Sequence, residues 1–199
     1  LIKSGSTIIS EIEFASQFTS ATLIGITGTN GKTTTTLLTY EILKKAGLNV
    51  GIAGNIGKSF ALQVAQSDFD YYVLEISSFQ LDNIQDFAPH ITLITNITPD
   101  HLDRYNYSLN KYRDAKLRIT KNQTARDFFL FNADDSILKE AIQNQQIVAK
   151  KIPFGFNNIT EGTTHKNDQI IIKQQNKNTM IQSAQFSLSG RHNLLNAMA

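Results

Sequence analysis

Residues 21–46 of this 199-residue chain read ATLIGITGTNGKTTTTLLTYEILKKA, and this stretch decides the fold. Residues 21–27 are apolar and rich in β-branched side chains, which is typical of a buried strand. A tight glycine-containing loop follows at once, and from Thr33 onward apolar residues recur at helical spacing as far as Gly47, a residue suited to ending a helix. The stretch therefore predicts a strand, a loop and a helix in direct succession.

The loop in this stretch has the composition of a phosphate-binding loop. Its glycines let successive backbone N–H groups face an anion, and the helix N-terminus adds partial positive charge. A lysine at position 32 supplies a point charge, and Thr33 offers its hydroxyl to Mg²⁺. Ile26 stands where the general motif has its first glycine, so an ordinary strand-to-helix turn is the alternative. The predicted nucleotide-binding residues are Gly28, Thr29, Asn30, Gly31, Lys32, Thr33 and Thr34.

Downstream of the loop, apolar strands alternate with amphipathic helices. This alternation predicts an α/β fold with a mostly parallel sheet and helices on both faces. Two short β runs, 169–173 and 179–182, flank a polar turn at 174–178 and predict an antiparallel hairpin at a sheet edge. Further strands are expected near 49–53, 71–76, 91–95 and 128–131, and helices near 59–65, 108–119 and 136–143, the last capped by Asp134 or Ser136.

The composition excludes several classes of protein. Hydrophobic residues make up 41% of the chain and charged residues 18%, which is typical of a globular domain. The absence of cysteine excludes disulfides, thiol catalysis and Cys-ligated zinc. A net charge of +2 is too small to argue for nucleic acid or an anionic membrane. No apolar run is long enough for a membrane span, so we expect a cytoplasmic protein.

Candidate metal ligands follow the predicted strands. Glu75 ends one strand, and Asp100 with His101 follows another, at the sheet edge where open α/β folds bind ligands. The alternatives are a solvated loop carboxylate and a packing or surface histidine. His90, His165 and His192 have less support as ligands. Lys116 has the spacing of a solvated lysine on a helix.

Several segments together resemble the Mur ligases, ATP-dependent enzymes that add amino acids to the peptidoglycan precursor. Folylpolyglutamate synthases share the loop GTNGKT, but the other segments are most similar to the Mur ligases that add D-glutamate to UDP-N-acetylmuramoyl-L-alanine. The segments are GITGTNGKTTTT at 25–36, GNIG at 54–57, LEISSFQL at 74–81, TPDHLDRY at 98–105, KYRDAKLRI at 111–119 and GRHNLLNA at 190–197.

The resemblance implies roles for individual residues. Lys32 is expected to contact the ATP phosphates, Thr33 and Glu75 to bind one Mg²⁺, and His101 to bind a second. Lys116 corresponds to a lysine that is carbamylated in the family, a modification that converts a cation into an anionic oxygen ligand. Lys32, His101 and Lys116 form the expected catalytic set. The resemblance also places Asn55, Ser77 and Gln80 at the muramoyl substrate and Asn193 and Asn196 near the adenine, with no role for Arg191.

The resemblance also implies a domain organisation. Residues 21–199 are expected to form the central ATP-binding domain, and residues 1–20 its connection from an N-terminal domain. The first residue is Leu1, and residues 193–199 read as a helix cut short, so we expect a piece of a longer, monomeric enzyme that is inactive on its own. Two alternatives remain open: a catalytically silent nucleotide-binding fragment and a folylpolyglutamate synthase-like ligase.

Overall fold

The structure is a computed structural model that describes residues 6–157, 159–174, 177–185 and 190–199. Within these residues a nine-stranded sheet has the order β2-β3-β1-β4-β5-β6-β7-β8-β9. Neighbours from β2 to β7 pair in parallel, and β8 and β9 add an antiparallel edge, as the sequence predicts. The strands are β1 (Thr22–Thr27), β2 (Val50–Gly54), β3 (Tyr71–Glu75), β4 (Ile91–Ile94), β5 (Phe128–Asn132), β6 (Lys150–Gly155), β7 (Gly162–Lys166), β8 (Gln169–Gln174) and β9 (Lys177–Gln182).

Helices connect the consecutive parallel strands from β1 to β6. The sequence did not predict α1, α4, β6 or β7, and residues 175–176 of the predicted hairpin turn lie outside the described part. Among the described residues, no helix has the length and apolar content needed to cross a bilayer. The helices are α1 (Glu11–Ser16), α2 (Lys32–Lys45), α3 (Phe60–Gln66), α4 (Ser78–Leu81), α5 (Leu109–Leu117), α6 (Ser136–Asn144) and α7 (Arg191–Met198), with 3₁₀ turns η2 (Leu102–Tyr105), η3 (Arg118–Thr120) and η4 (Ser183–Gln185).

One helix cap differs from the prediction. Neither Asp134 nor Ser136 caps α6; the N-cap is Asp135, whose side chain accepts a hydrogen bond from the backbone N–H of Leu138 at 2.9 Å. Asp134 instead accepts the backbone N–H of Phe156 at 2.8 Å, beyond the end of β6. Both carboxylates are adjacent capping-type residues, so the sequence alone does not distinguish them.

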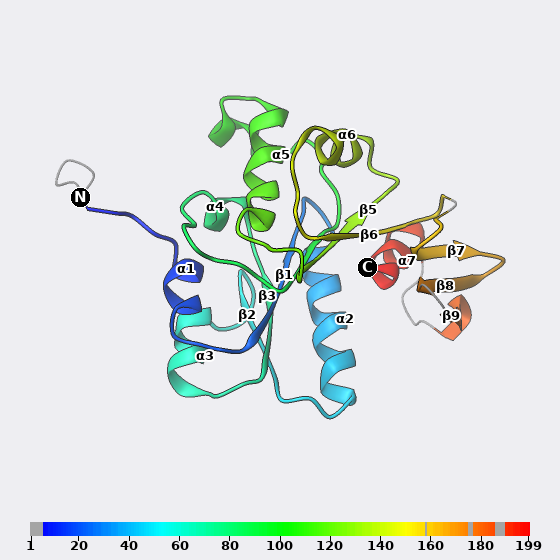
Figure 1. Cartoon of the computed structure of the whole chain (residues 1–199), viewed down its shortest axis with the longest axis horizontal. Helices are drawn as coiled ribbons and strands as arrows, with labels where there is room; N and C mark the ends of the chain where they lie inside the picture. The colour runs from blue at the N-terminus through cyan, green and yellow to red at the C-terminus, as the bar shows by residue number, and fades with distance from the viewer. Residues whose placement is uncertain (1–5, 158, 175–176, 186–189) are drawn as a thin grey trace.

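The sheet separates two apolar cores because side chains alternate along each strand. Tyr72 and Leu74 of β3 belong to the core under α1, α3, α4, α5 and α6. Val73 faces the opposite side, where it joins the core that includes side chains of α2 and α7. Figure 1 shows α2 on one side of the strands and α3 and α5 on the other.

The strand order brings three loops to one end of the sheet. β1 lies between β3 and β4, so Ile26 pairs with Glu75 on one side and Thr27 with Ile94 on the other. The chain runs from β1 outward to β2, returns to β3 between them, and then crosses to β4 on the other side of β1. Such a change of direction opens a crevice at the carboxyl ends of parallel strands, which is where open α/β sheets bind ligands.

The helix α1 is anchored by a buried carboxylate. Burial raises the pKa of Glu13, but hydrogen bonds from the backbone N–H groups of Gln85, Asp86 and Phe87 outweigh it and hold the pKa below its ordinary value. The Glu13 side chain is 0% exposed, and its Oε2 lies 2.9 Å from both Gln85 N and Phe87 N. The anchored helix therefore ties the segment before β1 to the loop that precedes β4.

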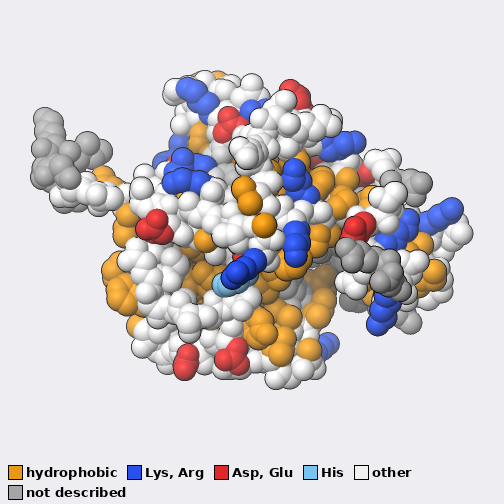
Figure 2. Space-filling model, viewed as in Figure 1, with side chains coloured by type: hydrophobic (Ala, Val, Ile, Leu, Met, Phe, Trp, Pro, Cys, Tyr) orange, Lys and Arg blue, Asp and Glu red, His pale blue; other side chains and the backbone are white. Residues whose placement is uncertain are grey.

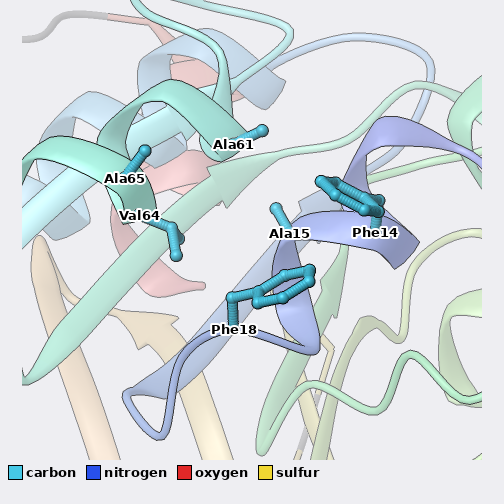
Figure 3. A pocket seen from close by; sticks show the side chains of 6 residues that line it. All are labelled: Phe14, Ala15, Phe18, Ala61, Val64 and Ala65. Carbon is cyan, nitrogen blue, oxygen red and sulfur yellow. The ribbon is translucent and has the colours of Figure 1, made fainter.

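The outer surface of α1 is apolar and partly open. Phe14 and Phe18 are 49% and 64% exposed. Their rings flank a cavity of about 240 Å³ between α1 and α3, and the α3 side is lined by Ala61, Val64 and Ala65 (Figure 3). Elsewhere on the face in Figure 2, basic and acidic side chains are interspersed, without one continuous region of a single sign.

We expect Glu13→Gln to lower the free energy of unfolding by about 2 kcal/mol or more, because the amide loses the charge and turns its NH₂ group toward backbone donors. Urea denaturation at pH 7 measures the change. Glu41→Gln is the matched control, since Glu41 is an exposed residue of α2 and its change should stay within about 0.5 kcal/mol. Equal losses for the two variants would refute the anchoring role of Glu13.

Candidate active site

The loop after β1 depends on two glycines. Gly28 has a φ of 143° and Gly31 a φ of 84°, conformations that L side chains rarely adopt. A Cβ on Gly28 would overlap the hydroxyl of Thr95, and a Cβ on Gly31 would overlap the amide oxygen of Asn196. The glycines therefore allow β4 and α7 to pack directly on the backbone that begins α2.

Two lysines meet at one carbonyl oxygen of this loop. The Nζ of Lys32 donates to the backbone oxygens of Gly28 at 3.0 Å and Thr29 at 2.8 Å. The Nζ of Lys116, from α5, donates to the same Gly28 oxygen at 2.8 Å. Two lysine side chains at one carbonyl oxygen, beside the N-terminus of α2, mark an electropositive site, which suits a polyphosphate.

Lys116 is buried in this arrangement. Its side chain is 2% exposed, and its Nζ lies 4.6 Å from the centre of the Tyr112 ring. Burial lowers the pKa of Lys116 to about 7, with a further lowering by the charge of Lys32 and an opposing effect of Asp100. Burial also lowers the pKa of Lys32, against the opposing charges of Glu75 and Asp100. The interpretation of Lys116 as a solvated lysine, which its helical spacing suggested, is therefore wrong.

Hard oxygen ligands stand beside the loop. The Thr33 hydroxyl donates to Oε2 of Glu75 at 2.7 Å, and the side-chain amide of Asn55 donates to Oε1 at 2.9 Å. Glu75 is 2% exposed, so the alternative of a solvated loop carboxylate is wrong. A hydroxyl and a carboxylate at a phosphate loop are ligands that Mg²⁺ prefers. The pair therefore fits a magnesium ion that would take its other ligands from phosphates and water.

His101 lies at the rim of the same site. It adopts a left-handed conformation with a φ of 46°, and its side chain is 61% exposed. Its Nε2 lies 3.6 Å from Oδ2 of Asp100, and its ring centre lies 5.6 Å from that of Phe79. Among the described residues no three Asp, Glu or His side chains converge into a metal cage. His101 alone therefore offers a single nitrogen ligand at the rim.

One cavity of about 150 Å³ is bordered by Lys32, Asn55, Asp100, His101 and Lys116, whereas Thr33 and Glu75 do not line it. Its lining residues follow the ends of β1, β2, β3 and β4 or lie on α5. No role was assigned to Ser78, Phe79 or Tyr112 from the sequence. Gln80 does not line the cavity; its Oε1 accepts the backbone N–H of Ser77 at 2.9 Å and so fixes the start of α4. The lining residues are Lys32, Asn55, Ser77, Ser78, Phe79, Asp100, His101, Tyr112 and Lys116.

A second cavity of about 160 Å³ lies on the other side of the loop. Asn196 lines it, whereas Asn193 does not. Thr95, Asn96 and Phe154 line it as well and were not predicted, although Thr95 and Asn96 directly follow β4 and strand-end position was the available signal. The lining residues are Asn30, Gly31, Thr95, Asn96, Phe154, His192, Leu195 and Asn196.

The remaining histidines lie outside the first cavity. Nδ1 of His90 accepts the backbone N–H of Leu23 at 3.5 Å, and Nε2 of His165 lies 2.8 Å from the hydroxyl of Ser183. His192 borders only the second cavity.

Comparison with known sequences identifies relatives along the whole chain. The profile of the Mur ligase middle domain matches residues 26–199. Two curated proteins, each named UDP-N-acetylmuramoylalanine--D-glutamate ligase, are 46% identical over 200 residues (Christiangramia forsetii) and 49% identical over 199 residues (Bacteroides fragilis). In both cases 100% of this chain aligns with 45% of the relative. The chain thus spans less than half the length of these relatives.

Solved structures share the fold at lower identity. The UDP-N-acetylmuramate:L-alanyl-gamma-D-glutamyl-meso-diaminopimelate ligase of Neisseria meningitides has a TM-score of 0.68 at 21% identity, covering 99% of this chain and 65% of its own. The MurF ligase of Thermotoga maritima in complex with ADP has a TM-score of 0.65 at 20% identity, covering 95% of this chain and 47% of its own.

Gly31→Ala and Gly47→Ala form a matched pair, because both glycines have similar positive φ values, 84° and 82°. Nothing lies within 4 Å of a Cβ on Gly47, whereas a Cβ on Gly31 meets Asn196. We expect Gly47→Ala to lower the free energy of unfolding by about 1 kcal/mol through backbone strain alone. Gly31→Ala should lower it by about 2–4 kcal/mol, because the side chain of Asn196 in α7 must also move.

The same pair should differ in nucleotide binding. Isothermal titration with MgATP should give at least roughly tenfold weaker binding for Gly31→Ala and unchanged binding for Gly47→Ala, because only Gly31 belongs to the phosphate loop. If the two variants lose stability and affinity equally, the contact between α7 and the loop has no functional role.

Proposed function

The chain belongs to the Mur ligase family, and on that premise we propose that the protein containing it is an ATP-dependent ligase that adds D-glutamate to UDP-N-acetylmuramoyl-L-alanine. The observation that carries the proposal is the convergence of Lys32 and Lys116 on the Gly28 carbonyl, next to the Thr33–Glu75 pair. The names of the relatives at 46% and 49% identity support D-glutamate as the amino acid added.

The proposed reaction has two steps. The carboxylate of the substrate's L-alanine attacks the γ-phosphorus of ATP, which forms an acyl phosphate and releases ADP. The amine of D-glutamate then attacks the acyl carbon, and the tetrahedral intermediate loses its proton and expels phosphate. In the first step two anions must meet, so charge neutralisation and alignment are the main demands on the protein.

The phosphate loop and the adjacent oxygens meet the first demand. Lys32 lies at the N-terminus of α2, where its ammonium exchanges backbone oxygens for phosphate oxygens when ATP binds. Thr33 and Glu75 would hold the magnesium ion, whose charge offsets that of the triphosphate. His101 is proposed as a ligand of a second ion. Asn55 holds the Glu75 carboxylate from the opposite side and so fixes its orientation.

Lys116 is proposed to act as a carbamate. Carbamylation requires the neutral amine, which adds to CO₂ with release of a proton. The burial that lowers the pKa of Lys116 to about 7 supplies that neutral form near physiological pH. The resulting anion would be an oxygen ligand for the second metal ion, a role that an ammonium group cannot fill.

The remaining contacts are assigned around these groups. Asn55 and Ser77 border the cavity and are proposed to contact the muramoyl substrate, with Gln80 acting through Ser77. Asn196, at the second cavity, and Asn193 are proposed to lie near the adenine. D-glutamate is proposed to bind with the help of a C-terminal domain, and residues 1–20 to lead from an N-terminal one. We propose a monomeric enzyme that supplies peptidoglycan precursors in the cytoplasm.

The first test is substrate dependence. The complete gene product containing this chain should release ADP from MgATP only when UDP-N-acetylmuramoyl-L-alanine is present, and should form the amide only when D-glutamate is added. The 199-residue chain alone should show no turnover, because it spans 45% of the length of its relatives. ADP release that depends on a folate instead would contradict the proposal and favour the folylpolyglutamate alternative.

The second test concerns Lys116. We expect Lys116→Ala in the complete enzyme to lower kcat at least roughly 100-fold, with partial rescue by formate or acetate, which restore an anionic oxygen. Lys111→Ala is the matched control, because Lys111 is an exposed lysine of the same helix and its loss should change kcat less than about twofold. Undiminished activity of Lys116→Ala would overturn the assigned role.

A further inference from the structure

The loop that carries His101 is fastened to the phosphate loop. The side chain of Asn96 accepts the backbone N–H of Asn30 at 3.0 Å and donates to its carbonyl oxygen at 2.9 Å. The Thr29 hydroxyl accepts the backbone N–H of Thr98 at 3.0 Å, and the backbone N–H of Thr29 donates to the Asn96 carbonyl at 2.9 Å. Residues 95–98 and the phosphate loop therefore form one hydrogen-bonded unit.

The opposite side of this loop is held by one carboxylate. Oδ2 of Asp135 accepts the backbone N–H of Ile97 at 2.6 Å, while its Oδ1 accepts the N–H of Leu138 and caps α6. Ile97 is 1% exposed and Asp135 is half-buried, so Asp135 shields the Ile97 N–H from solvent and is the acceptor that the structure gives it. Asp135 thus ties the loop after β4 to the junction between β5 and α6.

We propose that Asp135 is a positioning residue that sets the place of Asp100 and His101 in the active site. No role had been assigned to Asp135 beyond a helix cap, and it does not line the cavity. Residues 95–98 are held from two sides, by the phosphate loop and by Asp135. The rim residues Asp100 and His101 follow after Pro99; they contact each other and Phe79, the His101 carbonyl accepts the backbone N–H of Arg104, and Asp100 also acts electrostatically on Lys32 and Lys116. Their position therefore depends on how the preceding residues are anchored.

Loss of the Asp135 contact should affect the two halves of the site unequally. The hydrogen bonds of Asn96 and Thr98 to the phosphate loop do not involve Asp135, so the ATP loop keeps its support. The segment leading to His101 loses its only side-chain acceptor at Ile97 among the described contacts. Weaker placement of His101 should then reduce turnover and metal use more than ATP binding.

Asp135→Ser separates the two functions of the carboxylate. Serine is as good an N-cap as aspartate, so the bond to Leu138 and the start of α6 are kept. Its shorter side chain leaves the N–H of Ile97 without an acceptor. Asp127→Ser is the matched control, because Asp127 also accepts a backbone N–H, that of Thr124 at 2.6 Å, but lies at the other end of β5.

The first readout does not require activity. In the complete gene product with ¹³C-labelled histidine, Asp135→Ser should shift or broaden the ring resonance of His101 and leave that of His90 unchanged. Asp127→Ser should change neither. Asp135→Asn, which keeps one acceptor oxygen, is the second variant and should show the same change to a smaller extent. An unchanged His101 resonance in both Asp135 variants would overturn the proposal.

The second readout rests on the proposed ligase function. For Asp135→Ser we expect kcat to fall at least roughly tenfold and the Mg²⁺ concentration for half-maximal activity to rise at least about threefold, with the KM for ATP changing less than about threefold. Equal losses in Asp127→Ser, or unchanged kcat in Asp135→Ser, would contradict the proposal. If the unmodified protein does not turn over these substrates, the ligase function fails, and the His101 resonance still decides the positioning role.

Discussion

The site depends on the carbonyl oxygen of Gly28, which accepts hydrogen bonds from both Lys32 and Lys116. The fold buries Lys116 at this oxygen, and that burial together with the charge of Lys32 favours its neutral amine. Burial is the main cause of the lowered pKa of both lysines, and for Lys116 the charge of Lys32 adds to it. A triphosphate would offer anionic oxygens to the lysines in place of the carbonyl oxygens of Gly28 and Thr29.

The sheet order places every other part of the site around that oxygen. Because β1 lies between β3 and β4, Glu75 at the end of β3 and the loop after β4 that bears His101 flank the phosphate loop on opposite sides. The long hydrogen-bonded connection from Asn30 through Ile97 to Asp135 then extends the same scaffold to β5 and α6. Glu75 is thereby held at a strand end, whereas His101 lies in the loop that follows β4.

The sequence predicts much of the fold and several residues of the site, and there are physical reasons why it does not predict the rest. The strand, loop and helix at residues 21–46 were predicted because turn chemistry and apolar periodicity agree there. By contrast, β6 and β7 carry polar residues beside apolar ones, and α4 has only four residues, too few for a periodic signal. Burial of Lys116 was not predictable from helical spacing, because the tertiary contact with Gly28 joins residues 88 positions apart. The choice of Asp135 over Asp134 likewise depends on long-range partners.

The most direct measurement is the titration of Lys116 itself, followed through the ¹³C resonance of its labelled ε-carbon in CO₂-free buffer without nucleotide. We predict a midpoint of about 7. In the unfolded chain the lysine keeps its proton to about pH 10.4, so the free energy of unfolding rises with pH between these two values. A midpoint near the ordinary value of 10.5 would show that Lys116 is not held in this buried site and would contradict the account.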